Sequence, residues 1–593
     1  MKNRLITPPA EQSIALNKSF DLSTLKRKFA AKVLFRSCYY DLITGKLSVL
    51  DNVPGRWLAE QIVEYARVNH DINLIPALKK IAADPKYDES IRQRSSEVTE
   101  IIEDQYHAGK TTDNHSGIKS EEEKVINARI LFSGERYPQT SEVLRLLRDK
   151  SPELKRLALY LINKFRMSDL LLEVCECLNI QGLEGDAFFV LQSFGSEAGN
   201  ELRRFYLASS GNINTSRTIL RILGKTCTKE NSEFLFSRIW SNSRKIKETA
   251  LGFLVDCNFK APDNESDRLK KLIYDTFGLL TWIISAKMCL DKNIDTLLFR
   301  EMDNEFIRWK AFIFNLLYIM PESQTPARSA NEGGRKEDDN SGIIRKMVEI
   351  VFFDSQKPKF DMLNDFGSDK KILTRLNRYF PVEIPKYKEL LEDLINRDYN
   401  LINIWTKVCT LRNLAEIDDE DLAESVVALL FSPEEILQEE AARLIARSGK
   451  ELYKLASERI PEQTRQRLDK IISGEAGEDE LLIEKVRFLK SCFSEIQEED
   501  LLCLAVKLLF IANVKDEIAS LQGGNILWLM SEENPIPMVY VVHEGTDLTI
   551  KGFNLKTHGT FAYIISFSAI EEFHFQYPER SYEIFKYIDN NEE

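Results

Sequence analysis

The chain has 593 residues, of which 43% are hydrophobic and 29% are charged, a composition that excludes wholesale disorder. Its 80 basic and 93 acidic residues give a net charge of −13, which argues against a nucleic-acid surface as its main function. A chain of this length is too long for one compact core, so it is divided into domains or built from repeats that pack on their neighbours.

The N-terminal part of the chain is predicted to be helical. Residues 1–20 are polar, and we expect them to form a loose arm. Residues 21–106 contain four or five helical patterns, separated by breaks rich in Asn, Asp, Pro and Gly. Residues 107–124 have almost nothing to bury, which predicts a flexible linker.

Residues 125–321 and 343–495 repeat a pattern of paired helices. In one example, Ser432 and Pro433 supply an N-cap and a first helical position, and an acidic turn and an apolar face follow. Such a pair cannot bury its apolar face alone and needs a neighbour on each side. We therefore predict a mostly α fold, an irregular HEAT-like α-solenoid of paired antiparallel helices. Residues 322–342, between the two blocks, are polar and are expected to be a disordered loop.

The segment 265–320 has longer helical patterns and is more apolar than its surroundings. Aromatic stripes at helical spacing usually belong to a core, and a partner-binding groove is the alternative that stays open. Trp309 and Trp405 are the candidate partner-binding residues, with burial in the core as the competing interpretation. The longest apolar run, 277–286, is about half the length that spans a bilayer, so no membrane insertion is expected.

The pattern changes in residues 496–593. Segments 537–552 and 559–567 are rich in Val, Ile, Tyr, Phe and Thr and are interrupted by glycines, which predicts strands. A short helical pattern closes the chain. We therefore expect a small C-terminal β-rich domain after the helices.

Three runs carry a resemblance to a known family: KKILTRLNRYFPVE, LINRDYNLINIWTKVCTLRNLA and FSPEEILQEEAARLIA. They resemble the cytosolic helical region that follows the transmembrane helices in bacterial ATP/ADP-translocase-like transporters of the MFS type. The resemblance covers residues 265–590, and residues 1–264 share only the HEAT pattern. It implies a HEAT-type region followed by a domain similar to a cyclic-nucleotide-binding jelly roll. The membrane domain is missing, which implies a detached module that docks on a transporter or another membrane complex.

The resemblance also implies a cyclic-nucleotide cassette, with a glycine-rich turn, a carboxylate for the ribose and an arginine for the phosphate. Between Gly552 and Tyr563 the chain offers only FNLKTHGTFA, with Lys556 and His558 but neither an arginine nor an acid. We therefore expect a degenerate domain that does not bind cyclic nucleotides.

No other pattern in the sequence indicates a chemical activity. Phosphate-loop, dinucleotide and metalloprotease motifs are missing. His543, His558 and His574 could converge, but ordinary histidines are the preferred interpretation. The nine cysteines are scattered and are expected to be reduced, small apolar residues. We name no catalytic, cofactor-binding or metal-binding residue.

The preferred function is a non-catalytic scaffold or adaptor that binds protein partners, without nucleic acid or cofactor. The expected location is the cytoplasm, peripheral at the inner membrane through a partner, because the amino terminus lacks the apolar run of a signal peptide. A regulatory module that senses a small ligand through the C-terminal domain is the alternative. A DNA-binding HEAT enzyme is a third hypothesis, which the acidic balance disfavours.

Overall fold

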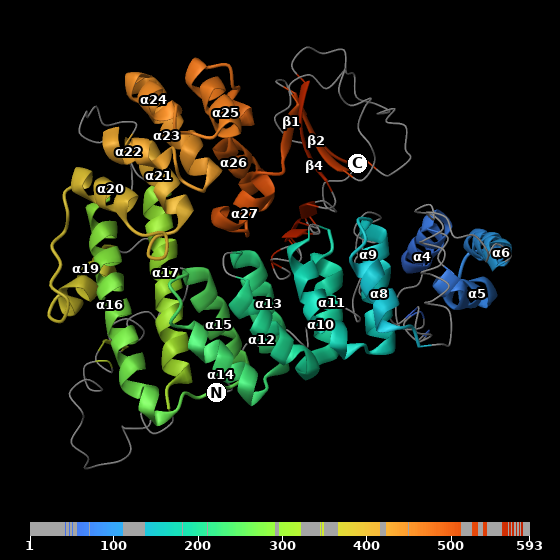
Figure 1. Cartoon of the computed structure of the whole chain (residues 1–593). Helices are drawn as coiled ribbons and strands as arrows, with labels where there is room; N and C mark the ends of the chain where they lie inside the picture. Colours follow the sequence, from blue (N-terminus) through green and yellow to red (C-terminus); the bar gives the residue numbers. More distant parts are fainter. Residues whose placement is uncertain are drawn as a thin grey trace. The chain divides into compact units, whose positions relative to one another are not determined.

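The structure is a computed structural model (Figure 1). It describes residues 42, 47, 50, 56–69, 72–110, 137–180, 182–209, 212–290, 296–321, 344, 347, 348, 366–414, 423–448, 450–511, 525–531, 538–542, 560–566 and single residues between 569 and 587. The expected arm and the expected loop at 322–342 lie outside the described residues. Of the expected linker, residues 107–110 end a helix, and the remainder also lies outside them.

The described residues are mostly helical and include one small antiparallel sheet, so the prediction of a mostly α fold with strands near the carboxyl end is confirmed. The chain divides into two compact units. The first comprises residues 1–226 and 509–593, and the second comprises residues 227–508.

Helical residues between 569 and 587 follow the strands of the first unit, and its other described helices precede the strands in the chain. They are α4 (Arg56–Asn69), α5 (Ile75–Ala83), α6 (Glu89–Lys110), α8 (Thr140–Leu147), α9 (Pro152–Phe165), α10 (Leu171–Glu176), α11 (Glu184–Phe194), α12 (Gly199–Ala208) and α13 (Ile213–Thr226), with 3-10 turns η1 (Ile72–Leu74), η2 (Ser168–Leu170), η3 (Cys177–Asn179) and η4 (Gly195–Ala198). Helix α9 has Pro152 at its first position and Glu153 in its first turn, which suits a helix N-terminus. Its apolar residues, among them Leu154, Leu157 and Leu161, are buried.

The sheet of the first unit has the strand order β1-β4-β2-β3 and is antiparallel throughout. Its strands are β1 (Leu509–Ile511), β2 (Asn525–Ser531), β3 (Met538–Val542) and β4 (Thr560–Ser566). The adjacent residues Leu527 and Trp528 are both fully buried, and because neighbouring side chains point to opposite faces, both faces of β2 are covered. In the same unit, the guanidinium of Arg217 on α13 lies 5.4 Å from the ring centroid of Tyr577.

The described residues of the second unit form helices and the loops between them, with no strand among them. It contains α14 (Lys229–Arg238), α15 (Arg244–Asp256), η5 (Asp263–Glu265), α16 (Ser266–Cys289), α17 (Thr296–Ile319), α19 (Phe366–Leu376), α20 (Tyr387–Asn396), α21 (Ile404–Leu414), α22 (Ala423–Leu429), α23 (Glu435–Ser448), α24 (Lys450–Ser457), α25 (Glu462–Ser473), η9 (Glu478–Glu480), α26 (Leu482–Cys492) and α27 (Glu498–Ala505). Several pairs of consecutive helices lie side by side, as α14 and α15 or α16 and α17 do (Figure 1). Before α23, the hydroxyl of Ser432 accepts a hydrogen bond from the backbone N–H of Glu434, as expected for a cap.

Helix α16 is much longer than the apolar run 277–286 that it contains. With the preceding turn it spans Asp263–Cys289 and has the length and mean hydropathy of a membrane span, yet 56% of its apolar window is buried within the protein. Lys287 on this helix is buried and pairs with Asp303 on α17 at 2.5 Å and with Asp369 on α19 at 2.9 Å. A helix with buried neighbours of this kind is a core helix. The core helix of a protein can have the same length and composition as a membrane span.

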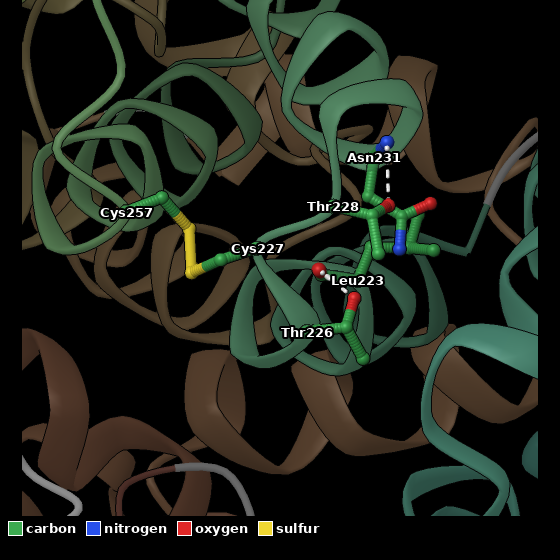
Figure 2. The surroundings of a disulfide bond; sticks show 6 residues. All are labelled: Leu223, Thr226, Cys227, Thr228, Asn231 and Cys257. Carbon is green, nitrogen blue, oxygen red and sulfur yellow. Dashed lines mark hydrogen bonds between the residues drawn. A yellow bond between two sulfur atoms is a disulfide. The ribbon is translucent and has the colours of Figure 1, made fainter.

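The expectation that all cysteines are reduced is wrong for one pair. Cys227, between α13 and α14, forms a disulfide with Cys257, which ends α15 (Figure 2). The two residues are 30 positions apart in the sequence, and only the folding of α14 against α15 brings their Cα atoms to 5.3 Å. Among the described residues, six further cysteines form no disulfide, and burial raises the pKa of the buried thiols Cys175, Cys177 and Cys409.

Candidate functional site

Helix α17 has two different faces, and it is the candidate site. Its inner face is buried in the second unit and consists mainly of apolar residues: Leu298, Met302, Trp309, Phe312, Ile313, Leu316 and Ile319. Its outer face also carries large apolar residues. Ile307 is 54% exposed and Phe314 is 58% exposed, and Ala311 between them is exposed as well. The helix therefore buries one apolar side and presents another to solvent.

A carboxylate lies at the centre of the buried inner face. Glu305 is completely buried, and Nη1 of Arg244 on α15 donates to its Oε1 and Oε2 at 3.2 and 2.9 Å. The backbone N–H of Asn403 donates to Oε1 at 2.8 Å. A buried carboxylate is tolerated when it is paired and hydrogen-bonded, and Glu305 is both.

Arg244 connects this carboxylate to further groups. Its Nε donates to Glu248 at 2.8 Å, its backbone N–H donates to Oδ1 of Asn400 at 3.0 Å, and its guanidinium lies 4.9 Å from the centre of the Trp309 ring. Burial alone would lower the pKa of Arg244, but the charges of Glu305 and Glu248 outweigh burial and hold the pKa above its usual range. We call Arg244, Glu305, Asn400 and Asn403 the polar hub. It fixes α15, α17 and the loop between α20 and α21 to one another.

Neither tryptophan named from the sequence lies on a surface. Trp309 is 6% exposed, and its Nε1–H donates to the carbonyl of Leu401 at 3.2 Å. Trp405, on α21, is 1% exposed and is among the largest fully buried side chains. Both point from their helices into the core of the second unit, as the competing interpretation has it. We therefore do not propose Trp309 and Trp405 as partner contacts.

A set of ion pairs holds α27 beside α17, although nearly 200 residues separate them in the sequence. Arg308 pairs with Glu499 at 2.6 Å, and Arg300 pairs with Glu498 at 3.0 Å. Burial would raise the pKa of Glu499, but Arg308, Lys245 and Arg244 outweigh it and keep the pKa below its usual range. Together with the polar hub, these ion pairs fix the part of α17 between Arg300 and Arg308.

One carboxylate in this set titrates near neutrality. Glu301 is 2% exposed and accepts a hydrogen bond from Asn304 at 3.1 Å. Burial, together with the charge of Glu498, raises the pKa of Glu301 to about 7. Burial is the main cause that raises the pKa of the fully buried Cys409 thiol, and the charges of Glu301 and Glu498 raise it further. Both groups lie in the packed interior beside α17.

The outer face of α17 carries a regular apolar row. Ile307, Ala311, Phe314 and Tyr318 follow one another at spacings of four, three and four residues, which is the spacing of alternating core positions in a coiled coil. Tyr318 is half-buried, and its hydroxyl donates to Oδ1 of Asn258 at 2.6 Å. We call these four residues the outer stripe. A row of this spacing is what a second helix packs against.

The remaining expected sites add nothing to this surface. In the stretches that the structure describes, no group of three or more His, Cys, Asp or Glu residues could hold a metal ion. His543, His558 and His574, and the degenerate cassette around Lys556, lie outside the described residues.

Comparison with known proteins identifies no family for this chain, so the proposed function depends on the geometry of the structure. No protein-family model matches the chain, and no curated protein matches it. Among solved structures, the crystal structure of Uso1-2 matches with a TM-score of 0.27 and 11% identity, over 84% of this chain and 94% of that chain. At this level of similarity neither its fold nor its role is transferred to this chain. What the described residues define is a class, a mostly helical protein with a small antiparallel sheet and a two-faced helix in its second unit.

Proposed function

We propose that this protein is a non-catalytic helical scaffold or adaptor and that it binds a partner protein through the outer stripe of α17. The observation that carries the proposal is the exposure of Ile307 and Phe314 on a helix whose opposite side is fixed by the polar hub. Burying a large apolar side chain contributes roughly 1.5–3 kcal/mol, so two half-exposed ones in one row offer a partner considerable binding energy. Exposed apolar patches with polar rims mark protein interaction sites.

We further propose that the helices form a HEAT-like solenoid and that the sheet belongs to a degenerate cyclic-nucleotide-binding-like domain, as in the transporter family that the sequence resembles. The packing of neighbours such as α8 on α9 and α26 on α27 supports the first part. The antiparallel sheet is consistent with the second part. On this proposal the partner is an integral membrane transporter or another membrane complex, approached from the cytoplasmic side.

The proposed location and the disulfide have to be considered together. Cys227 is exposed and Cys257 is half-buried, so reductants reach this pair. A reducing cytoplasm keeps accessible cysteines largely as thiols, whereas an oxidising compartment keeps the bond closed. For a cytoplasmic location we therefore expect Cys227 and Cys257 to be reduced thiols.

Site-specific photo-cross-linking in the cells that make this protein tests the proposed function. A photoreactive phenylalanine analogue at position 314 is expected to give one discrete cross-linked product, because the outer stripe is covered by the partner. The same analogue at Leu455, which is 76% exposed on α24, is the matched control and is expected to give none. The product should also disappear in Ile307→Asp, which places a charge in the contact. Equal labelling from both positions, or no product from 314, would contradict the proposal.

A further inference from the structure

We propose that Cys227 and Cys257 are a reversible redox pair: a hydroperoxide oxidises Cys227, Cys257 then closes the disulfide, and a small thiol reopens it. The inference goes beyond the proposed function, because it concerns a chemical modification of the second unit and does not depend on a partner. It is carried by the exposure of one sulfur, by a backbone that holds both residues without the bond, and by the contacts that link the pair to α17.

Cys227 is the accessible member of the pair. It is exposed, whereas Cys257 is half-buried. Cys227 directly precedes Thr228, the N-cap of α14, and Cys257 directly follows the last residue of α15. The N-terminus of a helix favours a negative charge and the C-terminus disfavours it, so the nucleophilic thiolate forms more readily at Cys227. The first reaction with an oxidant is therefore expected at Cys227.

The other described cysteines are less accessible than Cys227. Cys289 and Cys503 are half-buried, and Cys492 is buried. Burial raises the pKa of three further thiols, so their reactive thiolate forms are scarce at neutral pH: Cys175, Cys177 and Cys409. Among the cysteines that the structure describes, Cys227 is therefore the preferred target of an oxidant.

The backbone around both sulfurs is held by bonds that do not involve the sulfur atoms. The hydroxyl of Thr228 accepts a hydrogen bond from the backbone N–H of Asn231 at 3.2 Å (Figure 2). The backbone N–H of Cys257 donates to the carbonyl of Phe253 at 2.9 Å. Helices α14 and α15 also pack on each other. The two cysteines therefore stay close together when the bond is open, which allows the bond to close again.

Oxidation of the pair takes two steps. The Cys227 thiolate attacks the terminal oxygen of a hydroperoxide and takes up its OH group, the O–O bond breaks, and the released alkoxide or hydroxide takes a proton from water. Cys227 is then a sulfenic acid. The Cys257 sulfur attacks the Cys227 sulfur, the S–S bond forms, and the hydroxyl group leaves as water with the proton of the Cys257 thiol.

Reduction of the pair consumes two molecules of a small thiol. The first attacks the exposed Cys227 sulfur, which releases Cys257 as a thiol and leaves a mixed disulfide at Cys227. The second attacks the mixed disulfide, which releases Cys227 as a thiol and forms the disulfide of the small molecule. The protein thereby returns to its starting state.

The residues that follow Cys257 connect the pair to α17. Oδ1 of Asn258 accepts a hydrogen bond from the hydroxyl of Tyr318 at 2.6 Å, and the backbone N–H of Ala261 donates to the carbonyl of Ile319 at 2.8 Å. The disulfide fixes the start of this segment to the N-terminal end of α14. Local opening of residues 258–261 is therefore expected to be rarer in the oxidised protein, which holds the C-terminal end of α17 more firmly.

The first test uses the full-length protein, reduced and then freed of reductant, with hydrogen peroxide as the oxidant and mass spectrometry as the readout. The wild type is expected to form the Cys227–Cys257 disulfide. In Cys257→Ser, Cys227 should accumulate as a sulfenic acid that dimedone labels. In Cys227→Ser, oxidation of Cys257 should be at least about tenfold slower than that of Cys227 in Cys257→Ser. Equal rates in the two single variants, or no dimedone adduct at Cys227, would overturn the inference.

The second test adds reduced glutathione to the oxidised, folded protein. The pair is expected to open, with a mixed disulfide at Cys227 as the intermediate. Cys503→Ser, which removes a half-buried thiol of α27, is the matched control and should close and reopen the pair at the wild-type rates. A bond that resists glutathione in the folded protein and opens only in denaturant is a permanent structural disulfide, and that result would contradict the proposal.

The third test compares amide hydrogen exchange in the oxidised and reduced full-length protein. Amides of residues 258–261 are expected to exchange at least about threefold more slowly in the oxidised protein. Amides of α9 in the first unit should not change. In the double variant Cys227→Ser, Cys257→Ser, peroxide should leave the exchange of residues 258–261 unchanged. Equal exchange of this segment in the two redox states of the wild type would overturn the link between the pair and α17.

Discussion

Replacing Arg244 with alanine is expected to destabilise the second unit by about 3–5 kcal/mol, the usual cost of leaving a buried charge without its partner. The reason is Glu305, which is completely buried and would keep only the backbone N–H of Asn403 as a donor. The contact of the guanidinium with the Trp309 ring is lost at the same time. Chemical denaturation, followed by a probe in the second unit, measures the effect.

A matched control separates this effect from the general loss of an arginine. Arg465 on α25 pairs with Glu462 one turn earlier, and both side chains are exposed. Exposed pairs of this kind contribute little, so Arg465→Ala is expected to change the unfolding free energy by no more than about 0.5 kcal/mol. If the two variants were equally stable, the polar hub would not be the anchor of α17 that the geometry indicates.

Opening the disulfide is the second change with a large expected effect. Cys227 and Cys257 close a loop with a sequence separation of 30, and in the chain-entropy account such a closure lowers the entropy of the unfolded state by an amount worth about 3–4 kcal/mol. The double variant Cys227→Ala, Cys257→Ala should therefore unfold at a clearly lower denaturant concentration than the oxidised protein. Denaturation with and without a thiol reductant measures it.

Two further results, both obtained with a reductant, test the prediction for the disulfide. Reductant should destabilise the wild-type protein to about the level of the double variant, and it should leave the double variant unchanged, because the remaining thiols form no bond in the described structure. An oxidised protein that is no more stable than its reduced form would show that this pair does not hold α14 and α15 together.

The sequence predicts the helices well because their signals are local. Ser432 and Pro433 before α23, or Pro152 and Glu153 at α9, act on neighbouring backbone groups and need no distant partner. The polar hub has no such signal. Glu305 lies 61 residues from Arg244 and 98 from Asn403, and no pattern in the sequence shows that they meet.

The outer stripe shows a different limit of sequence analysis. The segment 304–320 is apolar on nearly all sides, so its periodicity marks a helix but does not show which side is buried. Trp309 is the largest apolar side chain there, and it lies on the inner face, whereas Phe314 lies on the outer face. The spacing of 307, 311, 314 and 318 is visible in the sequence, but the inner face has a similar spacing.

Strand β2 was missed for a related reason. Its sequence, NILWLMS, lacks the alternation of apolar and polar residues that marks a half-exposed strand. Both of its faces are buried, as Leu527 and Trp528 show, so no polar face is needed. Strands β3 and β4 lie in the segments 537–552 and 559–567, where strand-forming residues between glycines predicted them.

The central claim is that α17 buries one apolar face and presents another, and Phe312 and Phe314 test it within two residues of one helix. Phe312 is 4% exposed and Phe314 is 58% exposed. In variants Phe312→Cys and Phe314→Cys of the full chain, maleimide labelling at each position is followed by mass spectrometry of the α17 peptide. We expect position 314 to react at least about a hundredfold faster, because position 312 reacts only when the unit opens. Equal labelling rates at the two positions would contradict the account.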